Sequence, residues 1–278
     1  MNMTKFADLH IHTHYSDSTD SPQEVVRQAH FQKLMCIAIT DHDTVAGIAP
    51  TILAAQQFSL EIVPGIELST EIDEKDIHML GYFFDYQNPF LLEKLKQIQE
   101  ARLERIKKMI ALLKKEGINN IEWEEVCQLA PLASLGRPHL ATILKQKGWV
   151  RDIKEAFEKY IGDKCPAYVS KYKQTPYEAI DLIRRCGGVA VLAHPMLTNK
   201  DELIPSFIEA GLQGLEVYYA NSSDTSIKYY EGIAKKHHLI MTGGSDAHGK
   251  VKNNTYVGKT QIPYETVEQL RQVATVRR

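Results

Sequence analysis

The chain has 278 residues and a formal net charge of −2, with 44% hydrophobic and 24% charged residues. These values are ordinary for a globular protein and allow one substantial core, with room for a small appended domain. The near-neutral charge argues against long duplex nucleic acid as a partner, because no global basic field exists to hold it. It does not exclude a small anionic substrate, since bound metal ions would supply local positive charge.

Cysteine usage and the absence of long apolar runs bear on location. The four cysteines are scattered and form no C-x-x-C pair, which favours a reduced compartment over a disulfide scaffold. The first histidine motif starts within ten residues of the N-terminus, and no apolar run approaches transmembrane length. We therefore expect a cytoplasmic protein without a signal peptide or a membrane partner. The sequence leaves the oligomeric state open.

Strand-like runs alternate with helical patterns through the first third of the chain. A capping box with proline at the first helical position, Ser21-Pro22-Gln23-Glu24, opens a predicted helix that extends to about residue 33. The predicted strands of this part cover residues 6–12, 35–40, 61–68 and 77–84.

The middle of the chain is helical. A charged helix is predicted from about residue 90 to 116, because one apolar stripe recurs at helical spacing. Further helical patterns without clear strands continue to about residue 160. We therefore predict that residues 88–172 form a small helical domain inserted into a larger one. The stripe consists of Leu95, Ile98, Ile106, Met109, Ile110 and Leu113.

The last third returns to alternation. Thr175-Pro176-Tyr177-Glu178 repeats the capping signature, and its helix ends near Gly187-Gly188. Buried strands are predicted at 189–193, 214–219 and 239–242. Repeated strand–helix alternation predicts an α/β fold of parallel strands with covering helices, either a barrel or an open sheet, assigned to residues 1–87 and 173–278.

Histidines and carboxylates gather where these predicted strands end. The motif A-D-L-H-I-H-T-H-Y-S-D contains His10, His12 and Asp17, and T-D-H-D contains Asp41, His42 and Asp43. The segments P-G-I-E, D-I-H-M-L-G-Y, A-H-P and G-G-S-D-A-H add Glu67, His78, His194, Asp246 and His248.

This placement predicts a metal site with more than one ion. Residues two apart on a strand project to the same side, so His10 and His12 can reach one ion together. The active-site residues of α/β barrels come from the carboxyl ends of several strands, so they lie together at one end of the barrel. A single histidine at a strand end is more often only hydrogen-bonded, but that does not explain the whole set. Imidazoles and carboxylates without thiolates suit Mn²⁺, Fe²⁺ or Zn²⁺ better than Mg²⁺.

The motifs also resemble a known family. The ordered set D-L-H-x-H-T-x-x-S-D, T-D-H-D, G-x-E, H-x-x-G-Y, A-H-P and S-D-x-H is similar to that of the polymerase and histidinol phosphatase (PHP) family. The resemblance covers about residues 6–85 and 175–260. It implies a distorted seven-stranded β/α barrel with two or three divalent metal ions, Mn²⁺ first among them. The helical insertion resembles that of the family's stand-alone nucleotide phosphatases, which act on nucleoside 3′,5′-bisphosphates and trim short RNA from the 5′ end.

The resemblance also implies a ligand for each ion. His10, His12, Glu67 and Asp246 would hold the first ion, and Glu67 would bridge to a second held by His78 and His194. Asp17, His42 and His248 would hold a third. The family usually has glycine after the aspartate of the first motif, and this chain has Ser18. If that turn requires a positive φ, Ser18 would impose strain.

The expected reaction is hydrolysis of a phosphate ester by a metal-activated hydroxide. His42 and Asp43 are its candidate catalytic residues, with Asp43 orienting a ligand or moving a proton. In the insertion, G-R-P-H places Arg137 and His139 as candidate substrate-binding residues. Arginine grips phosphate through a two-pronged fork, which suits the substrate's second phosphate. Tyr219, at the end of a predicted strand, either meets a base or ribose or simply packs.

Three other interpretations stay open. Metal-dependent amidohydrolases also begin with H-x-H on the first strand, but their bridging carboxylated lysine has no counterpart where Glu67 stands. A histidinol-phosphate phosphatase would share the motifs, although the long insertion argues mildly against it. A non-catalytic accessory module would be expected to lose ligands. The substrate is therefore a small phosphorylated molecule, with a monophosphate, a 3′,5′-bisphosphate and a short oligoribonucleotide all open.

Overall fold

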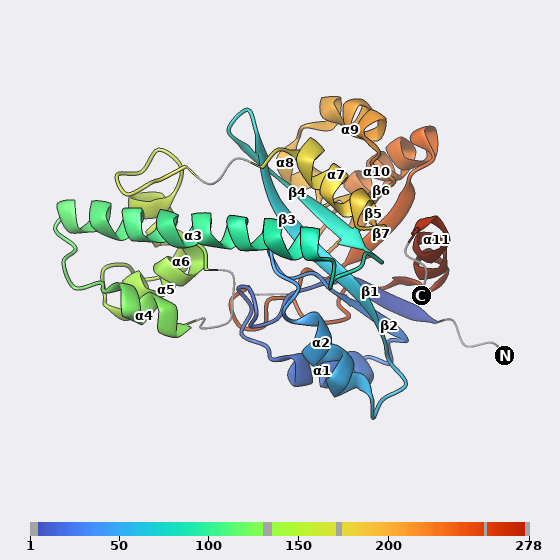
Figure 1. Cartoon of the computed structure of the whole chain (residues 1–278), viewed down its shortest axis with the longest axis horizontal. Coiled ribbons are helices and arrows are strands. Elements are labelled where there is room, and N and C mark those ends of the chain that lie inside the picture. The colour runs from blue at the N-terminus through green and yellow to red at the C-terminus, as the bar shows by residue number, and fades with distance from the viewer. Residues whose placement is uncertain (1–4, 130–134, 171–173, 253–254, 276–278) are drawn as a thin grey trace.

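An eight-stranded sheet curls into a nearly closed barrel at the centre of the computed structural model (Figure 1), which describes residues 5–129, 135–170, 174–252 and 255–275. The strands follow the order β7-β6-β5-β4-β3-β2-β1-β8. Where β7 ends, the Asp246 amide donates to the His10 carbonyl at 2.8 Å, which draws the sheet toward closure. The strands are β1 (Phe6–Ile11), β2 (Cys36–Ile39), β3 (Glu61–Ile72), β4 (Lys75–Tyr82), β5 (Val189–Leu192), β6 (Gly214–Tyr219), β7 (Ile240–Gly244) and β8 (Ile262–Pro263).

The predicted α/β barrel and its seven strands are confirmed, but the expectation of parallel strands throughout is wrong for β4. This strand is antiparallel to both β3 and β5. The connection explains the reversal, because β3 passes into β4 through Asp73 and Glu74, both with positive φ. Two such residues form a tight hairpin turn and leave no room for a crossover helix. The eighth strand pairs antiparallel with β1 and is too short to give a periodic signal.

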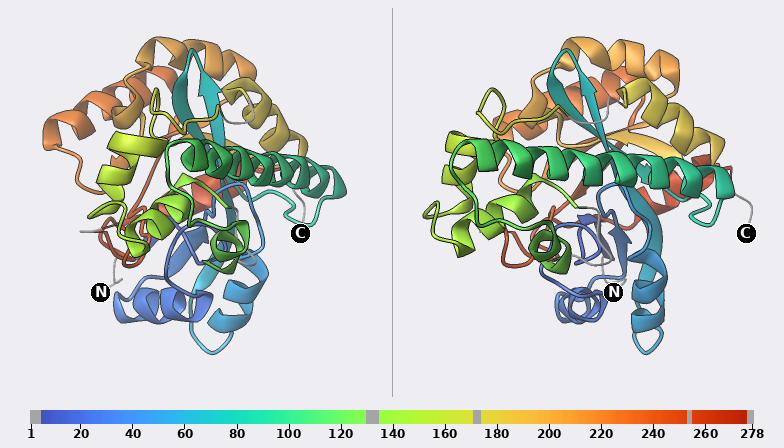
Figure 2. Two further views of the ribbon diagram at one scale, coloured as in Figure 1. Left: turned by 90° about the vertical axis from the view of Figure 1, so that its left-hand side faces the viewer. Right: turned by 60° about the vertical axis from the view of Figure 1, so that its left-hand side comes forward.

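Helices cover the barrel, as the views in Figure 2 show. The capping boxes predicted at Ser21 and Thr175 are both present, and they start α1 and α7. One hydrophobic cluster joins α1, α2, α7, α9 and α10 to the strands, and another includes residues of α11. The covering helices are α1 (Pro22–Phe31), α2 (Ile48–Ala55), α7 (Pro176–Arg185), α8 (Pro195–Thr198), α9 (Ile204–Ala210), α10 (Asp224–His237) and α11 (Glu265–Val273), with a 3₁₀ turn, η2 (Asp201–Leu203), before α9.

One long helix, α3 (Pro89–Lys115), links the barrel to the helices that project to the left in Figure 1. Its first half buries Leu95 and Ile98 in the barrel's cluster, and its second half buries Ile106 and Leu113 in a separate cluster. The predicted stripe is therefore the buried face of the helix. The other helices of this region are α4 (Trp123–Leu129), α5 (Arg137–Gln146), α6 (Ile153–Ala156) and the π-helix η1 (Phe157–Ile161).

The division into a barrel of residues 1–87 and 173–278 and an insertion of residues 88–172 stays a prediction. Within the described part of the chain, no helix combines the length and the hydropathy needed to cross a membrane.

Candidate metal centre

The barrel brings all nine predicted metal ligands to one mouth. His10 lies on β1, Glu67 within β3, and His194, Asp246 and His248 follow β5 and β7. His78 lies in the first half of β4, not at its carboxyl end. The reversal of β4 explains this position, because the start of an antiparallel strand lies at the same edge as the ends of its parallel neighbours.

Glu67 lies at the middle of the cluster and is 1% exposed. Its Oε1 is 2.7 Å from His78 Nδ1 and 3.0 Å from His194 Nε2. Its Oε2 is 3.1–3.3 Å from a ring nitrogen of each of three further histidines, namely His10, His12 and His42. One carboxylate thus faces two groups of imidazoles, with one oxygen for each group.

Two further carboxylates complete the cluster. Asp246 Oδ1 lies 3.3 Å from His12 Nε2 and 3.6 Å from His10 Nε2. Asp17 Oδ1 lies 3.1 Å from His248 Nε2, and Asp17 Oδ2 lies 3.8 Å from His42 Nε2. The structure therefore brings together the members of each set that the resemblance assigned to one ion.

The donor atoms fit divalent cations. Three overlapping sets have one ligand atom per residue within 4.8 Å of each other: His12–Asp17–His42–His248, His10–His12–Glu67 and His42–Glu67–His78. Two imidazoles also face each other without an intervening acceptor, since His10 Nε2 and His12 Nε2 lie 3.1 Å apart. Within the described residues, buried Asp17 Oδ1 and His42 Nδ1 make no well-aligned hydrogen bond, although His248 Nε2 and Glu67 Oε2 lie 3.1 and 3.3 Å from them. A cation between such atoms would satisfy them.

The electrostatics favour positive charge in this cluster. Burial lowers the pKa of His12, but the carboxylates of Asp246 and Glu67 outweigh burial and raise that pKa to about 9. Burial lowers the pKa of His42 to about 3, which keeps this imidazole neutral and able to offer a lone pair. The carboxylates thus supply negative charge, and His42 supplies a neutral donor.

Glu216 supports the cluster, and the sequence analysis did not single it out. It lies on β6 and is fully buried. Its Oε1 lies 2.9 Å from His10 Nδ1, and its Oε2 accepts from the His194 backbone amide at 2.8 Å. The carboxylate thus fixes the ring of one ligand and the backbone of another. The sequence feature that could have revealed Glu216 is a single acidic residue within the apolar run G-L-E-V-Y-Y.

We expect Glu216→Gln to weaken metal binding by roughly 10–100-fold. The amide keeps the side chain's volume but removes the charge that holds His10 Nδ1 as a donor. Titration of metal-free protein with Mn²⁺ measures the effect, and a wild-type dissociation constant in the variant would show that Glu216 only packs.

Asp41 shapes the first ligand loop and does not join the cluster. Its carboxylate accepts from the Thr13 amide, the Thr13 hydroxyl and the Ser16 hydroxyl, each at 2.7 Å. The strain anticipated at Ser18 does not occur, because Ser18 is not among the described residues with positive φ. Its hydroxyl instead accepts from the Asp20 amide at 3.1 Å.

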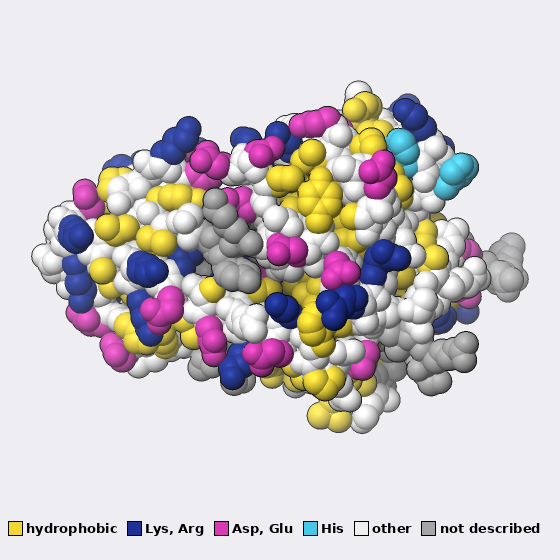
Figure 3. All heavy atoms as spheres, turned by 45° about the horizontal axis from the view of Figure 1, so that its top comes forward, with side chains coloured by type: hydrophobic (Ala, Val, Ile, Leu, Met, Phe, Trp, Pro, Cys, Tyr) yellow, Lys and Arg dark blue, Asp and Glu magenta, His cyan; other side chains and the backbone are white. Residues whose placement is uncertain are grey.

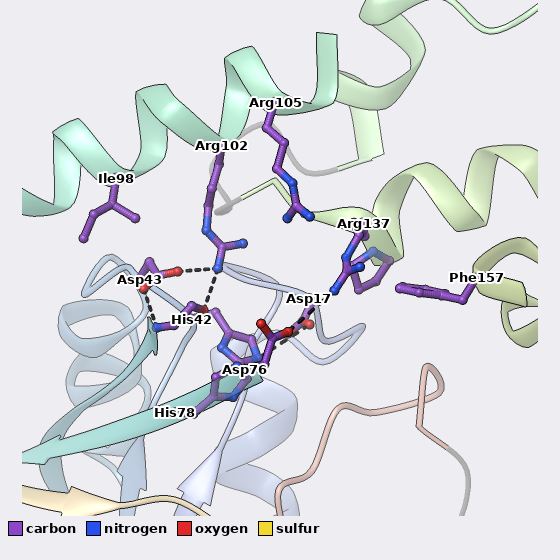
Figure 4. A pocket seen from close by; sticks show the side chains of 13 residues that line it. Asp17, His42, Asp43, Asp76, His78, Ile98, Arg102, Arg105, Arg137 and Phe157 are labelled. Carbon is purple, nitrogen blue, oxygen red and sulfur yellow. Dashed lines mark hydrogen bonds and ion pairs between the residues drawn. The ribbon is translucent and has the colours of Figure 1, made fainter. Parts of the chain in front are cut away.

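Asp43 connects the loop after β2 to α3. Its Oδ1 accepts from the Ser69 amide at 2.9 Å, and its Oδ2 pairs with Arg102 of α3 (Figure 4). Its carbonyl accepts from Gln99 at 2.9 Å, and its φ is 51°. These contacts give Asp43 a positioning geometry beside His42, and its catalytic role stays a prediction.

A cavity of about 170 Å³ lies directly beside the cluster. Asp17, His42 and His78 form its floor, and three arginines line it from α3 and α5 (Figure 4). Arg102 and Arg105 come from α3 and Arg137 from α5. The sequence analysis missed Arg102 and Arg105 as site residues, although their i, i+3 spacing places them on one face of the predicted helix.

The arginines differ in how well they are paired. Within the described part of the chain, the buried Nη2 of Arg105 has no hydrogen-bond partner, and burial lowers its pKa to about 10. Arg137 Nη1 donates to Asp163 at 2.8 Å, and its guanidinium lies 5.4 Å from the Phe157 ring centroid. Arg102 is paired with Asp43. Arg105 thus offers the clearest unsatisfied donor for an anion.

The other residues predicted as possible substrate contacts, His139 and Tyr219, have different neighbours. His139 Nδ1 accepts from the Gly136 amide at 3.1 Å and caps α5, and burial lowers its pKa. Its substrate-binding role stays a prediction, as does that of Arg137. Tyr219 donates to Asp246 Oδ2 at 2.8 Å, so it contacts one of the predicted metal ligands.

Comparison with known proteins identifies the family. The family model described as PHP domain matches residues 8–165. A curated 3′,5′-nucleoside bisphosphate phosphatase of Chromobacterium violaceum is 33% identical over 91% of this chain and 91% of its own length. The chain belongs to the PHP domain family.

Other PHP relatives extend this result. A 5′-3′ exoribonuclease Rnm of Escherichia coli is 33% identical over 89% of this chain and 88% of its own length. A crystal structure of a putative metal-dependent phosphoesterase from Bifidobacterium adolescentis matches with a TM-score of 0.88 and 30% identity, over 97% of this chain and 96% of that one. The likeness therefore includes the later strands, which carry His194, Asp246 and His248.

Proposed function

We propose that this PHP protein is a metal-dependent phosphoesterase that acts on nucleotides, with the 3′-phosphate of a nucleoside 3′,5′-bisphosphate as its preferred target. The observation that carries the proposal is the cavity in which the ligand cluster meets Arg105, whose Nε donates to the Val169 carbonyl and whose Nη2 has no partner among the described residues. With metal bound, the ligand cluster would act on the phosphate ester that is hydrolysed, and the arginines would bind a second phosphate. The relatives named as a bisphosphate phosphatase and an exoribonuclease support this substrate class.

Two or three divalent ions would occupy the centre, Mn²⁺ first, with Fe²⁺ or Zn²⁺ as alternatives. His10, His12, Glu67 and Asp246 would hold the first ion, Glu67, His78 and His194 the second, and Asp17, His42 and His248 the third. When bound, such ions lower the pKa of water and neutralise the phosphoryl oxygens. Both oxygens of Glu67 face imidazoles, which suits a bridging carboxylate.

The protein's own side chains bind and orient the substrate. Arg105 and Arg137 bind the distal phosphate, because guanidinium forks match phosphate oxygens. Asp43 pairs with Arg102 and so fixes the positive charge of this arginine at the cavity. Asp43 also orients the loop that carries His42. His139 contributes by capping the helix that presents Arg137.

One panel of substrates tests the proposal. Manganese-loaded protein is incubated with adenosine 3′,5′-bisphosphate, histidinol phosphate and a 5′-phosphorylated RNA dinucleotide, and released phosphate and nucleotides are resolved by chromatography. We expect selective release of the 3′-phosphate from the first. Activity on histidinol phosphate alone would make the protein a histidinol-phosphate phosphatase, and no turnover with metal bound would make it an accessory module.

The RNA dinucleotide tests a second activity. Cleavage of this substrate in addition to the bisphosphate would extend the proposal to 5′-3′ trimming of short RNA. The proposed setting is the cytoplasm, with a small phosphorylated substrate as partner and without long duplex nucleic acid.

A further inference from the structure

The two oxygens of Asp246 have different neighbours. Oδ1 faces the imidazoles of His10, His12 and His248, at 3.6, 3.3 and 3.3 Å. Oδ2 accepts a hydrogen bond from the Tyr219 hydroxyl at 2.8 Å and pairs with Lys252 Nζ. One oxygen thus faces other predicted metal ligands, and two donors hold the other.

The two donors also contact each other. Lys252 Nζ lies 3.0 Å from the Tyr219 hydroxyl and 5.5 Å from its ring centroid. The Tyr219 ring centroid lies 5.5 Å from the His194 ring centroid, with an angle of 65° between the ring planes. Tyr219 therefore packs between the carboxylate of one ligand set and the imidazole of another, while Lys252 approaches from the loop after β7.

The surroundings keep this arrangement in place. Asp246 is 4% exposed, and its backbone has a φ of 50°, a conformation that non-glycine residues rarely adopt. Its amide is bound to the His10 carbonyl at 2.8 Å. With the backbone fixed, the contacts at Oδ2 decide which way the carboxylate plane turns.

We propose that Tyr219 and Lys252 are positioning residues that set the strength of cation binding at Asp246 in opposite directions. Tyr219 strengthens binding, because its hydroxyl holds the carboxylate with Oδ1 toward the histidines. Lys252 weakens binding, because a fixed ammonium on the same carboxylate repels a cation at Oδ1. The inference rests on the metal centre of the proposed function and is independent of which ester is cleaved.

Tyr219 and Lys252 thus adjust how readily a cation bound at Asp246 would exchange. The Lys252 side chain is 38% exposed, so solvent and salt screen its charge in part. Lys252 also restrains Oδ2, so its removal has two effects on cation binding. The lost repulsion outweighs the lost restraint, because the ammonium and a cation at Oδ1 would lie on the two oxygens of one carboxylate. A neutral residue in place of lysine should therefore tighten binding, and the effect should shrink in high salt.

The test measures Mn²⁺ affinity of metal-free protein by calorimetric titration at low and high salt. We expect Tyr219→Phe to raise the dissociation constant roughly 10-fold, in the range typical for residues that orient metal ligands. We expect Lys252→Met to lower it at least about 5-fold at low salt, with a smaller change at high salt. Lys252→Arg keeps the charge and should stay near the wild-type value.

A matched control is Lys235→Met, since Lys235 is exposed on α10 and its Nζ pairs with Glu231 at 3.0 Å. Its affinity should equal that of wild type. Weaker or unchanged binding in Lys252→Met would overturn the assigned role of the lysine, and unchanged binding in Tyr219→Phe would overturn that of the tyrosine. Because these readouts are affinities, either failure leaves the substrate panel and the proposed activity standing.

Discussion

Glu67→Gln should lose stably bound metal and at least about 1,000-fold in kcat/KM, a cost of about 4 kcal/mol in transition-state stabilisation. The reason is geometric, because five imidazoles converge on this carboxylate within 3.3 Å. The amide keeps the shape but loses the charge and one acceptor, so two adjacent cation positions weaken together. Metal content by mass spectrometry and steady-state kinetics measure the two effects.

The matched control lies on the same strand. Glu61 belongs to β3 but pairs with Arg271 and accepts from Tyr264, away from the centre. Glu61→Gln should keep both metal and activity. If Glu67→Gln retained wild-type metal content, the carboxylate would be only a hydrogen-bond acceptor for the histidines, and the bridging role would be lost.

Arg105→Met should raise KM for a 3′,5′-bisphosphate by roughly 10–100-fold, because a charge-assisted pair to phosphate is removed. The same variant should act on a nucleoside 3′-monophosphate nearly as wild type does, since that substrate lacks the distal phosphate. Folding should survive, because the change removes a buried charge whose Nη2 has no partner in the described residues. Initial rates on the two substrates give the comparison.

Two further variants serve as comparisons for Arg105→Met. Lys108→Met changes an exposed residue one turn along α3 and should leave both KM values unchanged. Arg137→Ala should weaken binding of the bisphosphate less than Arg105→Met, because Arg137 is already partly neutralised by Asp163. Equal losses on mono- and bisphosphate in Arg105→Met would place the distal phosphate elsewhere.

Local patterns in the sequence predicted the parts of the site that each strand carries by itself. His10 lies on β1 and His12 directly follows that strand, and both are fully buried with Glu67 Oε2 beside them. Their alternation is a property of a single strand, so it is readable without knowledge of the fold. The same holds for the capping boxes at Ser21 and Thr175, whose partners lie three residues away.

The parts that the sequence did not reveal depend on contacts between distant segments. Glu216 meets His10 only after the sheet curls, and 206 positions separate them in the chain. Arg105 faces the cluster only because α3 extends from the barrel's hydrophobic cluster into a second one. The reversed β4 followed from a two-residue turn, which the periodicity of the apolar runs does not encode.

The most direct test of the account is a crystal structure of manganese-loaded protein, with the ions located by anomalous scattering. We expect peaks roughly 3.5–4 Å apart, on opposite sides of Glu67, with one carboxylate oxygen bound to each. His10 and His12 should contact one peak, and His78 and His194 the other. An active protein with no anomalous peak between these side chains would contradict the account.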